Sequence, residues 1–408
     1  MSKLANDIEF ISLSPAEIGL YSRHLLIPSI GVKGQLALKN ASVLMVGAGG
    51  LGCPVLLYLA AAGVGRIGII DADHIEISNV HRQILYRVVD KGKNKADVAK
   101  FRLQALNPYI EIETYIDRLN VDNAEALISR YDIVVDGTDN FTTKYLINDA
   151  CYFAGKPLVY GAIMQFEGQV AVFNALDEQG GYGANYRDLY SDPPDAALAP
   201  NCAEAGVLGI LPGIIGCFQA NEVIKLITGL GRSLSERLLI YDALDATTTE
   251  LHFSACADNP LRDPNRPHVL EEIPAICNSP VVSDQFVISL DEFNDLMRDH
   301  VVIHLIDVRE PHERKQVSIG GIHIPLAEID GVEHEYINDV PIILYCQSGV
   351  RSQKAAKILA DKLQHAQIFS LKGGISAFLA SNLYPELIAN LALCQCIPNK
   401  PQDADLST

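Results

Sequence analysis

A glycine-rich hexapeptide near the start of this 408-residue chain constrains its fold more than any other feature. Gly47-Ala48-Gly49-Gly50-Leu51-Gly52 follows the apolar run Ser42–Val46 and precedes the helical pattern Cys53–Ala62, which Gly63 ends. In such a loop one glycine makes the tight turn, one lets backbone N–H groups approach a phosphate, and one packs the helix on the strand. The helix N-terminus adds a positive dipole end. The pattern predicts a strand–loop–helix unit that binds a nucleotide.

Strand and helix patterns alternate after this unit. Strands are predicted at Arg66–Asp71, Ile110–Tyr115, Asp132–Asp136, Leu158–Ala162 and Gln169–Phe173. Helices are predicted at 14–40, ending in a glycine-rich turn at Gly31–Gly34, at Lys93–Leu106, at 121–129 and at 209–228. This alternation is typical of a Rossmann-like, doubly wound and mostly parallel α/β sheet.

Asp71 lies 19 residues after Gly52, at the end of the next predicted strand, where its carboxylate can accept hydrogen bonds from a ribose. NAD, FAD and ATP fit this pattern equally well. The cations that follow, Arg82 in Ser78-Asn79-Val80-His81-Arg82 and then Lys95, separate these readings. A dinucleotide has two bridging phosphate charges, whereas a triphosphate needs several cations and a metal, so the sequence favours ATP.

Two further groups extend the same site. Arg23 lies upstream of the glycine loop, and Thr138-Asp139-Asn140 follows the predicted strand that ends at Asp136. The carboxyl ends of parallel strands meet at one sheet edge, so Asp139 and Asn140 supply a carboxylate and an amide near the nucleotide.

A second loop, Cys346-Gln347-Ser348-Gly349-Val350-Arg351, also stands between a predicted strand, Val340–Tyr345, and a predicted helix, Ser352–Gln364. Such a loop can turn successive N–H groups inward as an anion-binding nest, and Gly349 tolerates the positive φ that this requires. The nest and the helix dipole stabilise a thiolate at Cys346. Arg351 can hydrogen-bond loop carbonyls or a bound anion.

Composition limits the remaining classes. The net charge of -18 argues against nucleic acid or an anionic membrane as a partner. The first ten residues lack an apolar signal region, and the longest apolar stretch, Val207–Phe218, is interrupted by Pro212 and is too short for a bilayer. We therefore expect a soluble, cytoplasmic protein. At about 150 residues per domain, the length predicts two or three domains.

Proline-rich sequence from Thr247 to about Asp284 reads as a linker. We expect a nucleotide-binding domain over 14–250, a linker over 251–284, a small α/β domain over 285–385 and a tail over 386–408. Residues 177–205 lack periodicity and contain many turn formers, which is typical of a functional or disordered loop.

The first domain resembles the MoeB/ThiF family, relatives of the ubiquitin-activating enzymes. The resemblance rests on Tyr21–His24, Gly47–Cys53, Ala61–Gly65, Ser78–Gln83, Thr138–Asn140 and Cys202–Val207. It implies MgATP-dependent adenylation of the C-terminal glycine of a ubiquitin-like sulfur-carrier protein that ends in Gly-Gly. It further implies that Asp139 positions magnesium and the reacting phosphate, that Lys95 and Arg82 hold phosphates, and that Arg23 reaches the ATP of the other subunit in a homodimer.

The chain departs from this family in one respect. Many members bind a structural zinc through two Cys-x-x-Cys pairs, but the first segment reads Asn185-Tyr186-Arg187-Asp188 here. In the second region only Cys256 and Cys277 occur, too far apart for a zinc knuckle. We predict that zinc is absent, as in a zinc-less subgroup of the family.

The last domain resembles a rhodanese, on Asp307–Glu310, Gly320–Pro325, Tyr345–Ser352 and Leu371–Ile375. This resemblance makes Cys346 a persulfide carrier, with a sulfur donor such as a desulfurase or thiosulfate. Family position implies that Cys202 is a thiol that attacks an acyl disulfide or takes the carrier as a thioester, whereas Cys53 is expected in the core.

Together the two signatures predict an adenylyltransferase and sulfurtransferase that makes a carrier thiocarboxylate for molybdenum cofactor, thiamine or related biosynthesis. Two alternatives stay open at this point. One is a nicotinamide-dependent oxidoreductase fused to a thiosulfate sulfurtransferase, and the other is a non-catalytic scaffold that binds the carrier.

Overall fold

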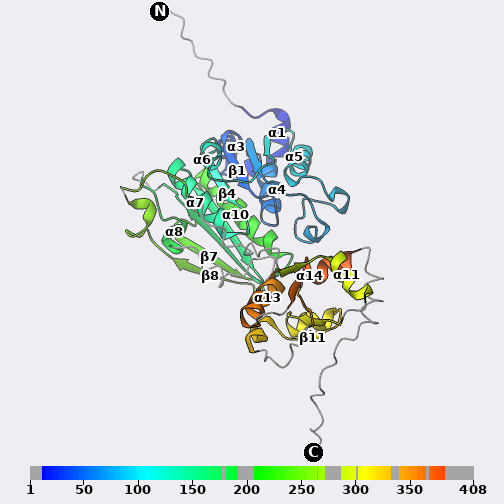
Figure 1. The fold of residues 1–408 in the computed structure, drawn as a ribbon. Helices are drawn as coiled ribbons and strands as arrows, with labels where there is room; N and C mark the ends of the chain where they lie inside the picture. Colours follow the sequence, from blue (N-terminus) through cyan, green and yellow to red (C-terminus); the bar gives the residue numbers. More distant parts are fainter. Residues whose placement is uncertain are drawn as a thin grey trace, which may run out of the picture. The chain divides into compact units, whose positions relative to one another are not determined.

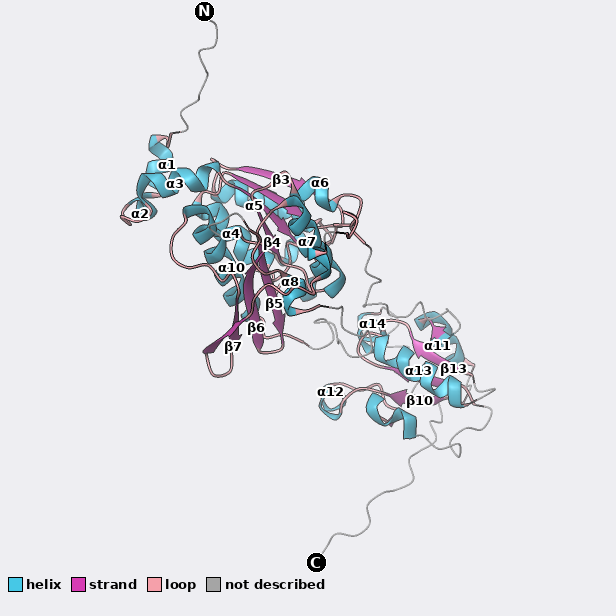
Figure 2. Cartoon of the chain, turned by 90° about the vertical axis from the view of Figure 1, so that its left-hand side faces the viewer, coloured by secondary structure: helices cyan, strands magenta, loops and turns pink. Residues whose placement is uncertain are grey.

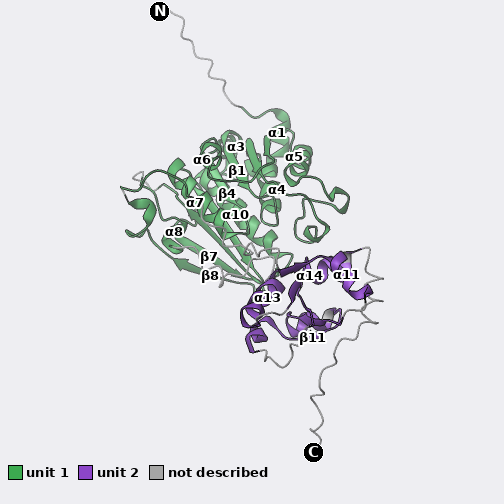
Figure 3. Cartoon of the chain, in the orientation of Figure 1, with its two compact units in different colours: residues 1–277 green, residues 278–408 purple. Residues whose placement is uncertain are grey.

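The computed structural model describes residues 12–176, 181–191, 206–263, 265–271, 286–299, 302–331, 340–363 and 367–381. The chain divides into two compact units, Met1–Cys277 and Asn278–Thr408, which Figure 3 shows in green and purple. Each unit contains one sheet of its own, and each is described separately below.

The first unit is built on an eight-stranded sheet of order β3-β2-β1-β4-β5-β6-β7-β8. The five parallel strands are β1 (Ser42–Val46), β2 (Arg66–Ile70), β3 (Glu111–Tyr115), β4 (Ile133–Asp136) and β5 (Leu158–Met164). Antiparallel strands β6 (Glu167–Phe173), β7 (Arg237–Asp242) and β8 (Thr247–His252) extend it at one side, and Figure 2 shows β4 to β7 next to one another. The predicted Rossmann-like, mostly parallel architecture is confirmed.

Helices cover both faces of this sheet (Figure 1). One apolar core lies under α3 (Gly31–Asn40), α4 (Gly52–Ala62), α5 (Lys95–Leu106) and α10 (Leu211–Thr228), and the other lies under α6 (Ala124–Ile128), α7 (Phe141–Ala154) and α8 (Tyr186–Leu189). Alternate residues of β1 feed the two cores, with Val43 and Met45 on one face and Leu44 and Val46 on the other. No helix in the described ranges is both long and apolar enough to cross a membrane.

The N-terminal segment differs from the single helix predicted for 14–40. It forms α1 (Pro15–Leu20), α2 (Ser22–Leu25) and α3, and Gly31 begins α3 instead of ending a helix. Ser14 caps α1 because its hydroxyl accepts the Glu17 N–H. Pro28 separates α2 from α3, since proline removes a backbone donor and clashes with the preceding turn.

The linker prediction from Thr247 is wrong for its first residues. Thr247–His252 pairs with β7 along its whole length as edge strand β8. All six side chains are exposed, so the segment lacks the buried apolar alternation by which a strand is predicted. A short 3-10 turn, η3 (Pro260–Arg262), follows within the first unit, and its Leu261 is buried.

The second unit has a five-stranded parallel sheet of order β11-β10-β12-β13-β9. Its strands are β9 (Val287–Ile288), β10 (His304–Asp307), β11 (Ile322–His323), β12 (Ile342–Tyr345) and β13 (Ile368–Leu371). Helices α11 (Leu290–Arg298), α12 (Pro311–Gln316), α13 (Val350–Lys362) and α14 (Gly374–Ala380) and the turn η5 (Leu326–Gly331) complete it. Apolar clusters on both faces of the sheet form the core.

A polar clasp joins α8 to the chain that follows β8. The Asp188 carboxylate accepts hydrogen bonds from the Cys256 N–H at 2.8 Å, from Asn259 Nδ2 at 2.8 Å and from the Asn185 N–H at 2.7 Å. Asn259 also donates to Asn185 Oδ1 at 3.0 Å, and Arg262 forms an ion pair with Asp188 at 3.2 Å. Burial alone raises the pKa of Asp188, but the hydrogen bonds it accepts lower that pKa more, so it lies below its ordinary value.

This clasp brings together the segments at which the family resemblance places zinc ligands. Asn185 and Asp188 are separated by two residues, as are Cys256 and Asn259, but only one of the four is a thiol. Hydrogen bonds already occupy the carboxylate and the amide of Asn259, and Cys277 lies outside the described residues. Since structural zinc usually needs four Cys or His ligands, the clasp does not fit that ion. The absence of zinc stays a prediction.

We expect Asp188→Ala to lower the free energy of unfolding by about 3 kcal/mol, because it leaves several donors unpaired around a side chain that is 0% exposed. Incubation of the unaltered protein with EDTA should leave its melting temperature unchanged. The control is Asp258→Ala, which removes an exposed carboxylate from the same segment and should have no effect. Stoichiometric zinc in the purified protein, or melting at lower temperature after chelation, would contradict this account.

Candidate nucleotide and sulfur-transfer sites

The glycine loop between β1 and α4 packs backbone against backbone. Gly47 has φ +88, and a Cβ on it would lie 3.0 Å from the carbonyl oxygen of Gly137, in the loop after β4. A Cβ on Gly52 would lie 2.2 Å from the carbonyl oxygen of Gly47. Any side chain at these two positions would push the loop off the sheet. The predicted roles of glycine in turning and packing therefore have a geometric basis here.

Asp71 braces this loop from the end of β2. Its carboxylate accepts the Ala48 N–H at 2.7 Å and the Asp73 N–H at 2.8 Å. Burial raises the pKa of Asp71, and the positive charge of Lys95 offsets part of that shift. Lys95 is itself buried at the start of α5 and pairs with Asp73 at 2.9 Å. Asp71 and Lys95 thus belong to one charged cluster under the loop, and their predicted contacts with ribose and phosphate stay predictions.

The segment after β2 also folds against the glycine loop. Ser78 and Asn79 lie in the 3-10 turn Ile77–Asn79, followed by Val80 and the exposed His81. The Arg82 guanidinium donates to the Ser78 carbonyl at 3.1 Å, and a Cβ on Gly50 would lie 3.7 Å from Arg82 Cγ. Arg82 therefore lies beside the glycines.

Asp139 lies in the loop between β4 and α7 and is exposed. Asn140 caps α7, because its side-chain oxygen accepts the Thr143 N–H at 2.9 Å. A buried ion pair fixes the start of this loop: the Lys144 ammonium donates to Asp136 at 2.8 Å and to the Gly161 carbonyl at 2.8 Å. The other oxygen of Asp136 accepts both the N–H and the hydroxyl of Thr138. Sequence reasoning missed Lys144, whose partner becomes evident only when α7 is placed on the sheet.

The loop has unsatisfied polar groups that fit a polar ligand. Among the described residues, the N–H groups of Gly49 and Gly50 find no acceptor. Gln83 is 4% exposed, its side-chain oxygen has no partner, and its side-chain nitrogen would lie 3.7 Å from a Cβ on Gly49. Gln83 was absent from the predicted site, although it ends the Ser78–Gln83 motif. Buried polar atoms are rarely left unpaired, so these residues fit the phosphates of ATP.

Asp139 is the carboxylate that we consider for magnesium. In the described part of the chain no three His, Cys, Asp or Glu side chains gather into a metal site. Mg²⁺ is commonly held by one or two carboxylates together with substrate phosphates and water. Asp139 fits that pattern, because Asp136 is committed to Lys144 and Thr138.

Arg23, Cys202 and Cys53 were also singled out in the sequence. Arg23 is exposed on α2 and has no hydrogen bond to any described residue. Cys202 lies outside the described residues. Cys53 is buried in α4, with its Sγ 3.6 Å from the Ala48 carbonyl oxygen, and burial raises the pKa of its thiol to about 12. The expectation of a core role for Cys53 is confirmed.

The second site is the loop that joins β12 to α13. Cys346 is 1% exposed, and its Sγ accepts the Gly349 N–H at 3.1 Å and lies 3.6 Å from the Ser352 hydroxyl. Gly349 has φ +96 and is the N-cap of α13, so the N-terminus of this helix adjoins the loop that carries Cys346. The first turn of α14 closes the loop from the side, since the Ile375 N–H donates to the Cys346 carbonyl at 2.8 Å. The Gly349 N–H and the N-terminus of α13 would stabilise a negative sulfur at Cys346.

Arg351 ends this loop and binds a carboxylate from another element. Its two terminal nitrogens donate to the two oxygens of Glu313 in α12, at 2.7 Å and 2.6 Å. The hydrogen bonds from Arg351 lower the pKa of Glu313. Deeper in the unit, Asp307 and the fully buried Arg309 form a bidentate pair that supports the end of β10. Sequence reasoning identified Arg351 but missed Glu313.

Comparison with known proteins divides the chain in the same way. Residues 21–261 match the ThiF family, and residues 289–381 match the rhodanese-like domain. The chain is 43% identical over 387 residues to a probable adenylyltransferase/sulfurtransferase, MoeZ, of Mycobacterium tuberculosis, covering 92% of this chain and 96% of that protein. It is 37% identical over 409 residues to the adenylyltransferase and sulfurtransferase MOCS3 of Xenopus laevis, covering 91% and 88%. The first unit alone is similar to the sulfur carrier protein adenylyltransferase of Thermus thermophilus, 50% identical over 250 residues, covering 60% and 92%.

Among solved structures, MccB of E. coli with MccA-N7isoASN has a TM-score of 0.53 at 22% identity. The match covers 61% of this chain and 75% of that chain, and it supports the fold alone. The family models and the relatives that match most of the chain show, beyond the fold, which family the chain belongs to. The chain belongs to the ThiF family and carries a rhodanese-like domain after its ThiF domain.

Proposed function

We propose that this protein adenylates the C-terminal glycine of a small ubiquitin-like sulfur-carrier protein and then transfers sulfur to it as a thiocarboxylate. The observation that carries this proposal is the presence, in one chain, of a phosphate cradle at Gly47–Gly52 and a sulfur-stabilising loop at Cys346–Arg351. Relatives of nearly the same length are named for both activities. The product would serve molybdenum cofactor, thiamine or a related sulfur-transfer biosynthesis in the cytoplasm.

The first step activates a poor electrophile. The carrier's carboxylate attacks the α-phosphorus of ATP, a new P–O bond forms, and pyrophosphate leaves. The N–H groups of the glycine loop, Arg82 and Lys95 would stabilise the phosphates, while Asp71 keeps the loop in place. Bound magnesium, held by Asp139, would neutralise charge on the departing pyrophosphate.

The second step uses Cys346. Its persulfide attacks the carbonyl carbon of the acyl adenylate, and AMP leaves, which gives an acyl disulfide between Cys346 and the carrier. Attack of the Cys202 thiolate on the Cys346 sulfur of that acyl disulfide releases the carrier thiocarboxylate and leaves a Cys346–Cys202 disulfide, which a cellular thiol reduces. Because Cys346 Sγ is buried, the atom that attacks the acyl adenylate is the added sulfur beyond it.

The nicotinamide alternative is not favoured. The relatives that match the chain over most of its length are named adenylyltransferases and sulfurtransferases, and none of the three described above is named an oxidoreductase. Arg82, Lys95 and Asp139 also provide more cations and carboxylates than the two bridging phosphates of a dinucleotide need.

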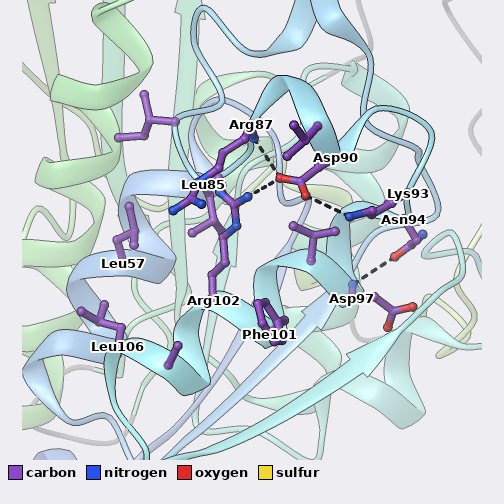
Figure 4. A pocket seen from close by; sticks show the side chains of 14 residues that line it. Leu57, Leu85, Arg87, Asp90, Lys93, Asn94, Asp97, Phe101, Arg102 and Leu106 are labelled. Carbon is purple, nitrogen blue, oxygen red and sulfur yellow. Dashed lines mark hydrogen bonds and ion pairs between the residues drawn. The ribbon is translucent and has the colours of Figure 1, made fainter.

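The proposed homodimer has a candidate surface between α4, α5 and residues 84–94. A pocket of about 910 Å³ lies there, and Figure 4 shows Leu57, Leu85, Phe101 and the Asp90–Arg102 ion pair among the side chains that line it. Two of its apolar side chains are strongly exposed, Phe101 by 75% and Val89 by 78%. Apolar patches of this kind commonly mark protein interfaces. In a homodimer, Arg23 of the partner subunit would complete the nucleotide site.

Asp139→Ala should reduce ATP–pyrophosphate exchange by at least about a hundredfold, because it removes the carboxylate that orients the magnesium and phosphate. Thiosulfate sulfurtransferase activity should persist, since that reaction uses the other unit. Both rates can be measured on the same preparation with the carrier protein present. Equal loss of both activities would point to a folding defect and contradict the assigned role.

Cys346→Ala should abolish thiocarboxylate formation while ATP–pyrophosphate exchange stays within about twofold of the original rate. The reason is that adenylation precedes any use of the sulfur site. Intact-mass measurement of the carrier reports the thiocarboxylate directly. The matched control is Cys256→Ala, an exposed thiol that should leave both steps unchanged. Continued thiocarboxylate formation in Cys346→Ala would refute the mechanism.

Phe101→Asp should convert a dimer to a monomer, because it places a charge in the apolar surface defined above. Light scattering after gel filtration measures the mass, and ATP–pyrophosphate exchange should fall in parallel if Arg23 acts across the interface. Leu251→Asp is the control, since Leu251 is 46% exposed on the edge strand β8 and lies outside this surface. An unchanged dimer would rule out this face.

A further inference from the structure

Arg351 is the only cationic side chain in the six-residue loop of Cys346. A loop that takes sulfur from a small dianion such as thiosulfate would be expected to present that charge to the donor. Instead, both terminal nitrogens of Arg351 are bound by Glu313 in a bidentate pair, at 2.7 Å and 2.6 Å. The two side chains are 24% and 21% exposed, so the pair lies at the solvent-accessible rim of the site.

Glu313 is held in this position by its own helix. It is the third residue of α12, and its carboxylate also accepts the N–H of Glu310, which precedes the helix, at 2.9 Å. The carboxylate therefore has three donors on its two oxygens, and the guanidinium hydrogen bonds keep it ionised. As a result the rim carries one positive and one negative charge in contact, and the net charge beside Cys346 is close to zero.

We propose that Glu313 sets the choice of sulfur donor: by neutralising Arg351 it disfavours small dianionic donors and favours a persulfide carried on a thiol. The inference rests on the proposed function of Cys346 as the sulfur carrier. Glu313 acts through Arg351 and touches neither sulfur, so it is a positioning residue.

The favoured loading step is a balanced exchange. The Cys346 thiolate attacks the terminal sulfur of the donor R–S–SH, a new S–S bond forms at Cys346, and the S–S bond of the donor breaks. The donor leaves as the thiolate R–S⁻, and the proton stays on the transferred sulfur, so no outside oxidant or reductant is needed. The attacking thiolate and the monoanionic product are stabilised by the Gly349 N–H and the α13 N-terminus, which require no cation.

The test compares two donors on the full-length protein. One is sodium thiosulfate, with cyanide as the acceptor, and the other is cysteine persulfide, with intact mass reporting the sulfur added to Cys346. Glu313→Gln should lower KM for thiosulfate by about tenfold, as expected from removing one nearby negative charge, with kcat within about threefold. The rate of loading by cysteine persulfide should change by less than about twofold.

Two control variants separate charge from structure. Glu313→Asp keeps the charge and should retain the original preference between donors. Glu310→Gln removes an exposed carboxylate from the same helix cap and should also leave the preference unchanged.

An unchanged KM for thiosulfate in Glu313→Gln, or equal changes with both donors, would overturn the inference while leaving the proposed function intact. Failure of Cys346 to gain a sulfur atom from either donor would overturn the proposed function, and the inference with it.

Discussion

The close contact between two backbone loops, at the carboxyl ends of β1 and β4, is the constraint on which the nucleotide site depends. Gly47 and Gly137 approach so closely that a Cβ on either would lie within about 3 Å of the other's carbonyl oxygen. This contact places Thr138 and Asp139 next to the glycine loop at the point where the chain reverses its direction across the sheet. Asp71 and the Asp136–Lys144 pair then hold the two loops from below. The contact between the two backbones therefore brings the loop of Asp139 to the glycine loop.

The two sites use one physical device with different electrostatics. Each places a glycine-containing turn between a parallel strand and the N-terminus of a helix, so that N–H groups and the helix dipole face an anion. The first loop has Arg82 beside it and Lys95 beneath it, two cations that the proposed triphosphate would require. In the sulfur site the one cation of the loop is paired with Glu313. The difference matches the charge of what each loop has to stabilise.

Local patterns were enough to predict most of the sheet. Gly47–Gly52, Asp71 and Cys346–Arg351 are defined by short spacings along the chain, and each follows a parallel strand in the structure, while their roles stay predictions. Two of the residues that were missed act through partners far away in sequence. Glu313 is 38 residues from Arg351, and Asn259 is 71 residues from Asp188. Edge strand β8 was missed because it is exposed on both faces and has no apolar alternation.

Burial of Cys346 links the loop's chemistry to the order of the reaction. A 1% exposed thiol cannot reach far, so sulfur must first be added to it, and the added atom extends the side chain toward its acceptor. A persulfide is more acidic and more nucleophilic than a thiol, and it needs stabilisation as a monoanion only. One N–H at 3.1 Å and a helix N-terminus supply that, whereas a strongly cationic loop would hold the sulfur too tightly to release it. The neutral rim therefore suits a site that must both accept sulfur and pass it on.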